Sequence, residues 1–389
     1  MLRALGLILC LLIPLAAVDL LNPEQVTADT SIGVLLATTG SAAIPEEVDE
    51  RALKRLYPDW WGARGDARGL AAKQLLAEGL RSKRDEQRYG LLAQSLSLAA
   101  DARQLGACLD AATALAKHFD RDAVLDLLRS ELPSLRDPGA QALALLDDPL
   151  NPTANGVVGS HLALSERRYA EAAVYWLLCD DPALVALAEA DTGTDALAAA
   201  EAWDRYGEDI RKRDERAVAW ARALEAYQHA IPDLDGARLR QAEDRRLTLL
   251  GAVPASWVDL EWDAITAEEW DALRATTVSV AAKTKPTDCR IRLAEGQQLR
   301  VVPHPSDTWT WEGRYWQTAH TVTWRGQRTL LSMGGPHALG ELTVLLSKDG
   351  PRQSVGLVTG PAQVHLAPFI SYDEAVGKGT IRAKLIPVE

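Results

Sequence analysis

The amino-acid sequence is that of an acidic globular protein. It has 389 residues, 47% of them hydrophobic and 25% charged, and a formal net charge of −12. This composition is ordinary for a folded protein, and the length favours two or three domains over one. The acidic balance argues against nucleic acid and anionic membrane surfaces as partners. A local basic run at residues 211–213 is followed at once by Asp214 and Glu215, so we interpret it as a solvated helix face.

Residues 1–17 have the pattern of a secretory signal peptide. Arg3 supplies the positive charge, Leu5–Leu15 is an apolar run of the usual length, and two alanines follow it. The run is too short to span a bilayer comfortably as a helix. Leu15 occupies a position where a cleavage site has a small residue, which leaves an uncleaved anchor as the alternative. We therefore expect an exported protein (periplasmic, cell-envelope or extracellular) with no membrane span after signal cleavage.

Three cysteines remain after such a cleavage: Cys108, Cys179 and Cys289. Export permits disulfides. Cys108 and Cys179 both fall in helical patterns, so they can pair if their helices touch. The alternative is that all three are buried free thiols. The cysteines do not have the spacing of a CxxC motif or of a zinc site.

Residues 45–150 are predicted to form a helical domain, with its first helix starting near Pro45. Apolar residues recur there at helical spacing. The segments concerned are 70–82, 89–102, 107–119, 123–132 and 140–146. Glycine, aspartate and proline separate them, and the short links imply antiparallel packing of neighbouring helices. Residues 21–44, which precede this domain, are expected to be a poorly packed lead-in.

Residues 151–250 show a helical spacing like that of tetratricopeptide repeats. Two units are visible, each with small and aromatic residues at the expected places of two successive helices. The matching residues are Gly159, Ser160, Tyr169, Glu171, Ala172 and Trp176 in the first unit, and Trp203, Tyr206, Gly207, Ile210, Ala223, Tyr227 and Ala230 in the second. A solenoid normally needs three or more repeats, so the preceding helices are expected to supply further packing.

The helical region also resembles modules of uncharacterised multidomain exported bacterial proteins. The resemblance is carried by DDPLNPTANGVVGSHLALSERRYAEAAVYWLLCDDPAL (147–184) and AWARALEAYQHAIPDLDGARLRQAEDRRLTLL (219–250), and it covers about residues 50–250. It implies a helical scaffold and no particular activity. The aliphatic and alanine-rich faces of the segment agree with that interpretation.

Residues 251–275 are predicted to be a linker with one short helix. Thr266 is its expected N-cap, and Glu269 completes a capping box. The linker also contains three closely spaced carboxylates beside two tryptophans: Asp259, Glu261 and Asp263 beside Trp257 and Trp262. Paired carboxylates can perform acid/base catalysis, but their place in a linker favours a docking segment.

Residues 276–389 are predicted to form a β domain. Valine, threonine, tryptophan and glycine replace alanine and leucine there, and apolar and polar residues alternate in about nine short segments. Alternation at this spacing, with glycine turns between the segments, is typical of an antiparallel β-sandwich or jelly roll. The fold class expected for the whole chain is therefore multidomain α + β, with an α-helical, TPR-like or α-solenoid body followed by a C-terminal jelly-roll-like β-sandwich.

The order of short motifs in this domain resembles galactose-binding lectin-like sandwiches. The matching residues are Thr287–Asp288, Ile291–Leu293, Glu295–Gln297, Asp307–Trp309, Gly340–Leu342, Val355–Gly356, Gly379–Ile381 and Lys384. In that family a calcium loop of Asn and Asp residues binds the sugar. The corresponding stretch here, residues 371–378, keeps Asp373 and Glu374 but lacks the Asn-rich pair. Because calcium needs several oxygen ligands at once, we expect no cofactor, with calcium as the alternative.

Tryptophans can still stack on sugar rings. Trp309 and Trp311 share one face of a strand, Asp307 falls on the same face, and Trp316 follows. We predict ligand binding by these four residues and Asp373. The competing interpretation is that the tryptophans form the core of the sandwich. His304, between two prolines, is expected to be a surface residue of a loop.

The sequence lacks a recognisable catalytic motif: no G-x-S-x-G, HExxH, P-loop or GxGxxG before a helix is present. We therefore predict a non-enzymatic exported protein, a helical scaffold with a binding or assembly β-sandwich, and glycan as the leading ligand class. The alternative is a purely structural or protein-interaction role with a cell-envelope protein as partner. A third hypothesis is a divergent hydrolase that uses Asp307 with His304 or His320.

Overall fold

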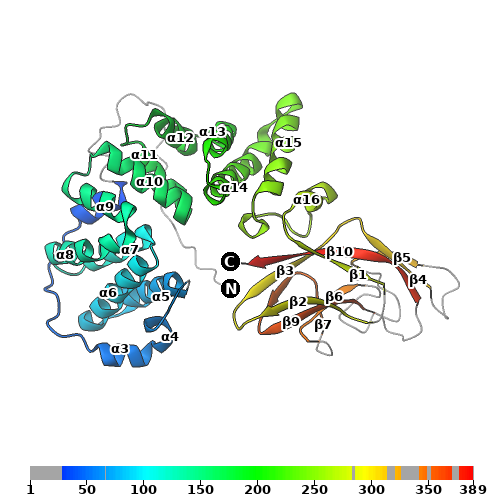
Figure 1. Cartoon of the computed structure of the whole chain (residues 1–389), viewed down its shortest axis with the longest axis horizontal. Helices are drawn as coiled ribbons and strands as arrows, with labels where there is room; N and C mark the ends of the chain where they lie inside the picture. The colour runs from blue at the N-terminus through cyan, green and yellow to red at the C-terminus, as the bar shows by residue number, and fades with distance from the viewer. Residues whose placement is uncertain are drawn as a thin grey trace, which may run out of the picture. The chain divides into compact units, whose positions relative to one another are not determined.

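The computed structural model describes residues 29–65, 67–282, 285–312, 320–325, 341–347, 352–369 and 376–388. The chain divides into two compact units, Met1–Ala226 and Tyr227–Glu389. The first is helical, and the second contains two further α-helices and two antiparallel sheets (Figure 1). A helical body followed by an antiparallel β region is therefore confirmed. The predicted signal peptide lies outside the described residues, and none of the helices described is long and apolar enough to cross a membrane.

The helices of the first unit follow the apolar periodicity of the sequence closely. Their bounds are α2 Ser31–Ala37, α3 Glu50–Leu56, α4 Pro58–Trp61, α5 Ala67–Arg81, α6 Asp85–Asp101, α7 Leu105–Ala116, α8 Arg121–Glu131, α9 Asp137–Asp147, α10 Pro152–Glu166, α11 Tyr169–Trp176, α12 Pro182–Thr192, α13 Ala196–Asp209 and α14 Arg213–Ala230. Side chains of Asp120, Asn151 and Asp195 accept hydrogen bonds from free amides in the first turns of α8, α10 and α13. All five apolar segments predicted between residues 70 and 146 are confirmed as α5 to α9, whereas the first helix after Pro45 begins at Glu50.

An aromatic cluster holds α10, α11 and α13 together. Gly159 lets α11 approach α10, because a Cβ at this position would lie 2.8 Å from the Trp176 ring. Trp176 and Trp203 are fully buried, with ring centroids 5.6 Å apart. The Trp203 indole donates to a buried carboxylate of Asp191, which also pairs with Arg222 on α14. The small and aromatic positions seen in the sequence are therefore packing positions.

The expected loose lead-in is wrong for residues 31–37. They form α2, whose Ile32 and Leu35 are fully buried. The Thr30 side chain caps the helix, and the hydroxyl of Tyr175 on α11 accepts a hydrogen bond from the Ile32 amide at 3.2 Å. Seven residues are too few to show a clear helical period. Their burial depends on α7 and α9, which lie far away in the sequence.

A charged cluster joins α7 to the α10–α11 turn. The Arg168 guanidinium donates to both carboxylate oxygens of Asp110, at 2.9 and 3.0 Å, and its Nε lies 2.5 Å from Glu171. Glu166 is close by and accepts from the Gly106 amide. Burial raises the pKa of Glu171, the carboxylates of Asp110 and Glu166 raise it further, and Arg168 opposes them, leaving the pKa at about 7. The Arg168 guanidinium therefore lies among three carboxylates, those of Asp110, Glu166 and Glu171.

Replacing Glu171 with glutamine is expected to flatten the pH dependence of the helical unit. A carboxyl whose pKa is higher in the folded state keeps a proton that the unfolded chain releases. Wild-type stability should therefore fall as pH rises from about 4.5 to about 7, by about 2–3 kcal/mol. Glu171→Gln should lack that fall and be the more stable protein above this range. Thermal unfolding followed by circular dichroism measures both, with the exposed Glu225→Gln as matched control. A slope equal to that of the wild type would contradict the prediction.

The described residues of the second unit contain two α-helices, two short 3-10 helices (Ile231–Asp233 and Ala255–Trp257) and ten strands. The α-helices are α15 Gly236–Ala252 and α16 Ala267–Ala272. The strands are β1 Thr276–Ala281, β2 Thr287–Leu293, β3 Gln298–Pro303, β4 Thr308–Glu312, β5 His320–Thr323, β6 Leu342–Leu345, β7 Arg352–Ser354, β8 Leu357–Thr359, β9 Ala362–Pro368 and β10 Val376–Val388. The predicted alternating segment at residues 328–333 lies outside the described residues.

Two antiparallel sheets share one core. The larger sheet has the order β5-β4-β10-β3-β8, with β1 also paired to β10, and the smaller has the order β2-β9-β6-β7 (Figure 1). Apolar side chains of both sheets meet between them, among them Leu299, Trp309 and Ile381 from the larger and Val344 and Leu366 from the smaller. Alternate residues of β3, β6, β9 and β10 belong to this core, as the sequence pattern predicts.

The three cysteines that follow the predicted signal peptide are free thiols. Cys108 on α7 and Cys289 on β2 are buried, and Cys179 is partly exposed. Burial raises the pKa of Cys289 to about 12, with a smaller contribution from the charge of Asp288. Burial also raises the pKa of Cys108 strongly. All three are therefore free thiols in this structure, but only Cys108 and Cys289 are buried as the interpretation expected. Burial makes these two thiols poorly reactive.

Candidate functional site

The long strand β10 organises the polar residues of the β unit. On one side it pairs first with β4, at Val376–Gly379, and then with β3, at Ala383–Val388. The turn between β3 and β4 fills the interval. The His304 amide donates to the Arg382 carbonyl at 2.8 Å, and the Asp307 carboxylate accepts from the Arg382 amide at 2.8 Å. Asp307 thus replaces a strand partner that β10 lacks at this point.

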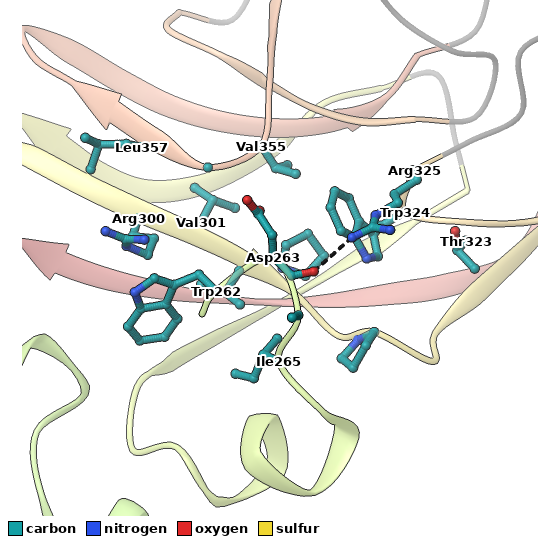
Figure 2. Close-up of a pocket in the computed structure, with 15 residues that line it drawn as sticks. Trp262, Asp263, Ile265, Arg300, Val301, Thr323, Trp324, Arg325, Val355 and Leu357 are labelled. Atoms are coloured by element: carbon teal, nitrogen blue, oxygen red, sulfur yellow. Dashed lines mark hydrogen bonds between the residues drawn. The ribbon is translucent and has the colours of Figure 1, made fainter. Parts of the chain in front are cut away.

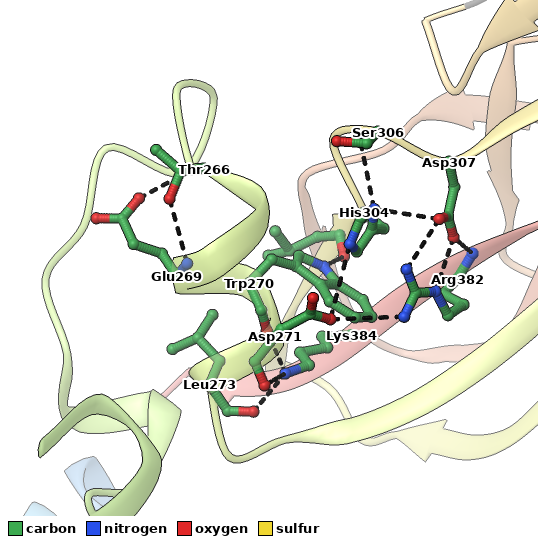
Figure 3. A network of polar contacts seen from close by, with 11 residues as sticks. Thr266, Glu269, Trp270, Asp271, Leu273, His304, Ser306, Asp307, Arg382 and Lys384 are labelled. Carbon is green, nitrogen blue, oxygen red and sulfur yellow. Dashed lines mark hydrogen bonds and ion pairs between the residues drawn. The ribbon is translucent and has the colours of Figure 1, made fainter. Parts of the chain in front are cut away.

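Asp307 also binds the side chain of the same arginine. Its two oxygens accept from Arg382 Nε at 3.0 Å and from an Arg382 terminal nitrogen at 2.9 Å (Figure 3). Burial acts to raise the pKa of Asp307, but the hydrogen bonds from Arg382 and the charges of His304 and Arg382 outweigh it, so the pKa is lowered. The Asp307 side chain is only 15% exposed. Both oxygens of the Asp307 carboxylate therefore accept hydrogen bonds from within the fold.

His304 is buried, so its expected surface position is wrong. It is 4% exposed, and its ring packs edge-on against Trp270 with centroids 4.6 Å apart. Its Nδ1 accepts from the Ser306 amide and lies 3.2 Å from Asp307. The residue is in a loop, as predicted, but α16 covers that loop. A local sequence pattern cannot reveal this cover, because it comes from a helix more than thirty residues earlier in the chain.

Helix α16 is fastened to the larger sheet by polar contacts (Figure 3). The predicted capping box is confirmed: Glu269 N donates to Thr266 Oγ1, and Thr266 N donates to Glu269. The Trp270 indole donates to the Val302 carbonyl at 2.9 Å. The buried Lys384 ammonium donates to the carbonyls of Trp270 and Leu273 and lies 4.5 Å from the Trp270 ring centroid. The Lys384 ammonium therefore interacts with carbonyl groups at the C-terminal end of α16.

A cavity of about 580 Å³ opens beside this helix, between the linker and the larger sheet (Figure 2). Its lining combines two tryptophans, two arginines, one aspartate and an apolar floor. The residues are Trp262, Asp263, Ala264, Ile265, Arg300, Val301, Val302, Pro303, Pro305, Thr323, Trp324, Arg325, Val355, Gly356 and Leu357. A volume of this size is within the range of small-molecule and sugar sites.

Each tryptophan of this Trp262–Trp324 pocket is paired with an arginine. The Arg300 guanidinium lies 4.9 Å from the Trp262 ring centroid, and Arg325 lies at the same distance from the Trp324 ring. Arg325 also donates to the Asp263 carbonyl at 2.9 Å, which connects the linker to the end of β5. Trp262 and Trp324 are both partly exposed. The pocket therefore offers aromatic surface together with fixed guanidinium groups.

Two of the five residues predicted to bind ligand are engaged inside the fold, and the side chains of the other three lie outside the described part of the structure. Trp309 is completely buried in the core, the position that the competing interpretation gave it. Asp307 is bound to Arg382. The backbone of Trp311 pairs with His320 and Gly377 in the sheet, and its side chain is outside the described part of the structure. Trp316 and Asp373, with the loop compared to the calcium loop, also lie outside the described residues.

Sequence reasoning missed the pocket because its walls come from separated segments. Trp262 was assigned to a docking linker, and Arg300 and Arg325 were not singled out. The available signal was composition: the linker and the β domain hold seven of the twelve tryptophans. That signal does not show which of the seven share a wall.

Comparison with known proteins gives no relative for this chain. No family model, curated protein or solved structure matches it. Within the described residues, His, Cys, Asp and Glu do not gather in a group of three or more that can hold a metal ion. The geometry of the pocket is therefore the basis for a functional assignment.

Proposed function

We propose that this chain is a non-enzymatic, exported glycan-binding protein, in which the helical body is the scaffold and the Trp262–Trp324 pocket is the binding site. The observation that carries the proposal is the pairing of two partly exposed tryptophans with two arginines around one cavity. Indole faces stack on the C–H faces of sugar rings. Guanidinium groups bind carboxylate or sulfate groups in two-point contacts. An acidic glycan has both the sugar rings that stack on the indoles and the anionic groups that bind the guanidinium groups.

The TPR-like and lectin-like resemblances concern the scaffold and the sandwich fold, and the proposed binding site does not depend on them. The close helix approaches at Gly159 and at Gly207, where a Cβ would meet Trp176 and Trp220, support a repeat-like scaffold. The two facing antiparallel sheets support a lectin-like sandwich. The site proposed here is nevertheless distinct from the calcium loop of that family, and binding through it needs no metal.

Replacing Trp262 or Trp324 with alanine is expected to weaken glycan binding by about tenfold or more, which corresponds to ~1.4 kcal/mol. A glycan array should first be screened with the full-length chain, with calcium and with chelator. The full chain is needed because a fragment that starts after Trp270 loses the contacts of this residue with Val302 and Lys384. Titration of the best array ligand into each variant then gives the affinities.

Trp61→Ala, on α4 of the helical unit, is the matched control and should bind like the wild type. Wild-type affinity in both pocket variants would show that the glycan binds at a different site. A folded chain that binds no glycan in either buffer would favour the alternative, a structural or protein-interaction role in the cell envelope. Loss of binding in chelator alone would restore the calcium-dependent mode of the lectin-like family.

A further inference from the structure

The helical unit contains a second cavity, which the proposed glycan site does not involve. Its volume is about 730 Å³, again in the range of small-molecule sites. It lies among α5, α6, the α6–α7 turn, α7 and the end of α10. The lining residues are Ala72, Lys73, Leu76, Ser95, Ala102, Arg103, Gln104, Ala107, Asp110, His161, Ser165, Glu166, Arg167 and Arg168.

The acidic residues of this cavity are already bound. Both oxygens of Glu166 lie within 3.0 to 3.2 Å of the Gly106 amide, in the first turn of α7, and its side chain is 10% exposed. Asp110 accepts two hydrogen bonds from Arg168. The Arg168 chain fits because Gly106 has no side chain: a Cβ there would meet the guanidinium at 2.1 Å. Arg168 therefore balances the charge of Asp110, and a backbone amide holds Glu166 in the wall of the cavity.

Three exposed cations lie around the mouth of the cavity, where the exposed carboxylate is that of Asp110, already paired with Arg168. Lys73 comes from α5, Arg103 from the α6–α7 turn and Arg167 from the end of α10, and all three are exposed. Alanine and leucine side chains of α5 and α7 line the space between them. Three cations from three separate segments thus surround a space that is large enough for a small molecule and is lined by both polar and apolar side chains. Cations arranged in this way attract an anion more strongly than any one of them alone.

Two of these arginines have an unusual backbone conformation. Among the described residues, the non-glycine positions with positive φ are Arg103, Arg136, Arg167 and Arg290. Both Arg103 and Arg167 have φ +57°, a region that glycine adopts without strain and a branched or long side chain does not favour. They follow or end helices, where a cation also interacts favourably with the helix dipole. At both positions the backbone conformation alone would favour glycine.

We propose that this cavity binds a small polyanion with carboxylate or phosphate groups, held at its mouth by Lys73, Arg103 and Arg167. The oxyanion groups lie at the three cations, and the carbon skeleton faces the apolar residues between them. Phosphate esters and polycarboxylates share this chemistry. The site is independent of the Trp262–Trp324 pocket, so either site can exist without the other.

Because φ is positive at Arg103 and Arg167, glycine can replace either residue without disturbing the backbone. Arg103→Gly and Arg167→Gly remove a cation while placing glycine where the backbone favours it, so both variants should fold with at least the wild-type thermal stability. Isothermal titration of the full chain with citrate, and separately with inorganic phosphate, at constant ionic strength should show at least tenfold weaker binding in each variant. Arg136→Gly changes a positive-φ arginine outside the cavity and should bind like the wild type.

Citrate and phosphate distinguish polycarboxylate from phosphate ligands by their relative affinities in the wild-type chain. Failure of both probes to bind in the millimolar range would overturn the proposal. Equal affinity in Arg103→Gly, Arg167→Gly and Arg136→Gly would overturn it as well. In that case the two arginines serve only the ends of α6 and α10, and their glycine variants should lose stability without any change in anion binding.

Discussion

Replacing Trp309 with alanine is expected to lower the free energy of unfolding of the β unit by about 3–5 kcal/mol. The ring is completely buried between the two sheets, where it contributes to the same core as Leu299 and Ile381. Its removal leaves a cavity that the paired strands on both sides cannot close, because β4 is hydrogen-bonded to both β5 and β10. Urea unfolding with hydrogen exchange measured at β3 and β10 reports the stability of this unit.

Trp324→Ala is the matched control, since it removes the same side chain from a partly exposed position that lines the pocket and packs against the same core. It should lower stability by less than Trp309→Ala, by about 1–2 kcal/mol, while weakening glycan binding. Trp309→Ala should have the opposite profile, with a large loss of stability. Equal losses of stability in the two variants would show that Trp309 is not a core residue.

The second large effect is expected at Asp307, whose replacement with alanine should lower the stability of the β unit by about 2–3 kcal/mol. The variant leaves the Arg382 amide without its acceptor, at the point where β10 has no strand partner on that side. The guanidinium of Arg382 is 41% exposed and can turn to solvent, so the loss should be smaller than for a fully buried ion pair. Asp307→Asn keeps an acceptor oxygen and should lose less.

Asp307 also predicts how the β unit responds to acid. Its pKa is lowered in the folded state, so its stabilising contribution is present above the unfolded pKa of about 3.9. The contribution is lost as pH falls through the folded pKa. Asp307→Asn should therefore lack part of the acid-induced loss of stability below about pH 4. Urea midpoints measured at neutral and acidic pH test this, and an unchanged acid sensitivity would assign that loss to other carboxylates.

Gly379 illustrates a constraint that the core tryptophan places on its neighbouring strand. It pairs with Trp309 and has φ +101°, and a Cβ there would lie 2.9 Å from the Thr308 carbonyl oxygen. In the sequence this glycine was part of a short terminal motif resembling a lectin. In the structure it permits β4 and β10 to approach where Trp309 enters the core. The close approach of the two strands therefore accounts for a glycine at this position.

Local features could be predicted well from the sequence. The apolar periodicity placed α5 to α9, and the pairing of Thr266 with Glu269 gave the capping box of α16. The alternation after residue 276 gave the antiparallel strands. These features depend on residues within one or two turns of each other, or on the alternation of side chains along one strand. Such information is contained in a short window of sequence.

The site required information from distant parts of the chain. Strand alternation puts Trp309 and Trp311 on one face, but it does not show which face meets the second sheet. Asp307 could be recognised as an acceptor, but its donor, Arg382, lies 75 residues later. Helix α2 is buried only because distant helices cover it. Trp262 and Trp324 line one cavity only after the linker has folded against β3 and β5.

The sequence by itself therefore determined the two-part architecture of this protein, the positions of most helices and the antiparallel nature of its β region, because local periodicity and capping encode them. The tertiary structure alone decided which tryptophan is core and which lines a pocket, and which carboxylates are already bound by arginine. Those outcomes depend on contacts between segments far apart in the chain, for which the local pattern of residues contains no signal.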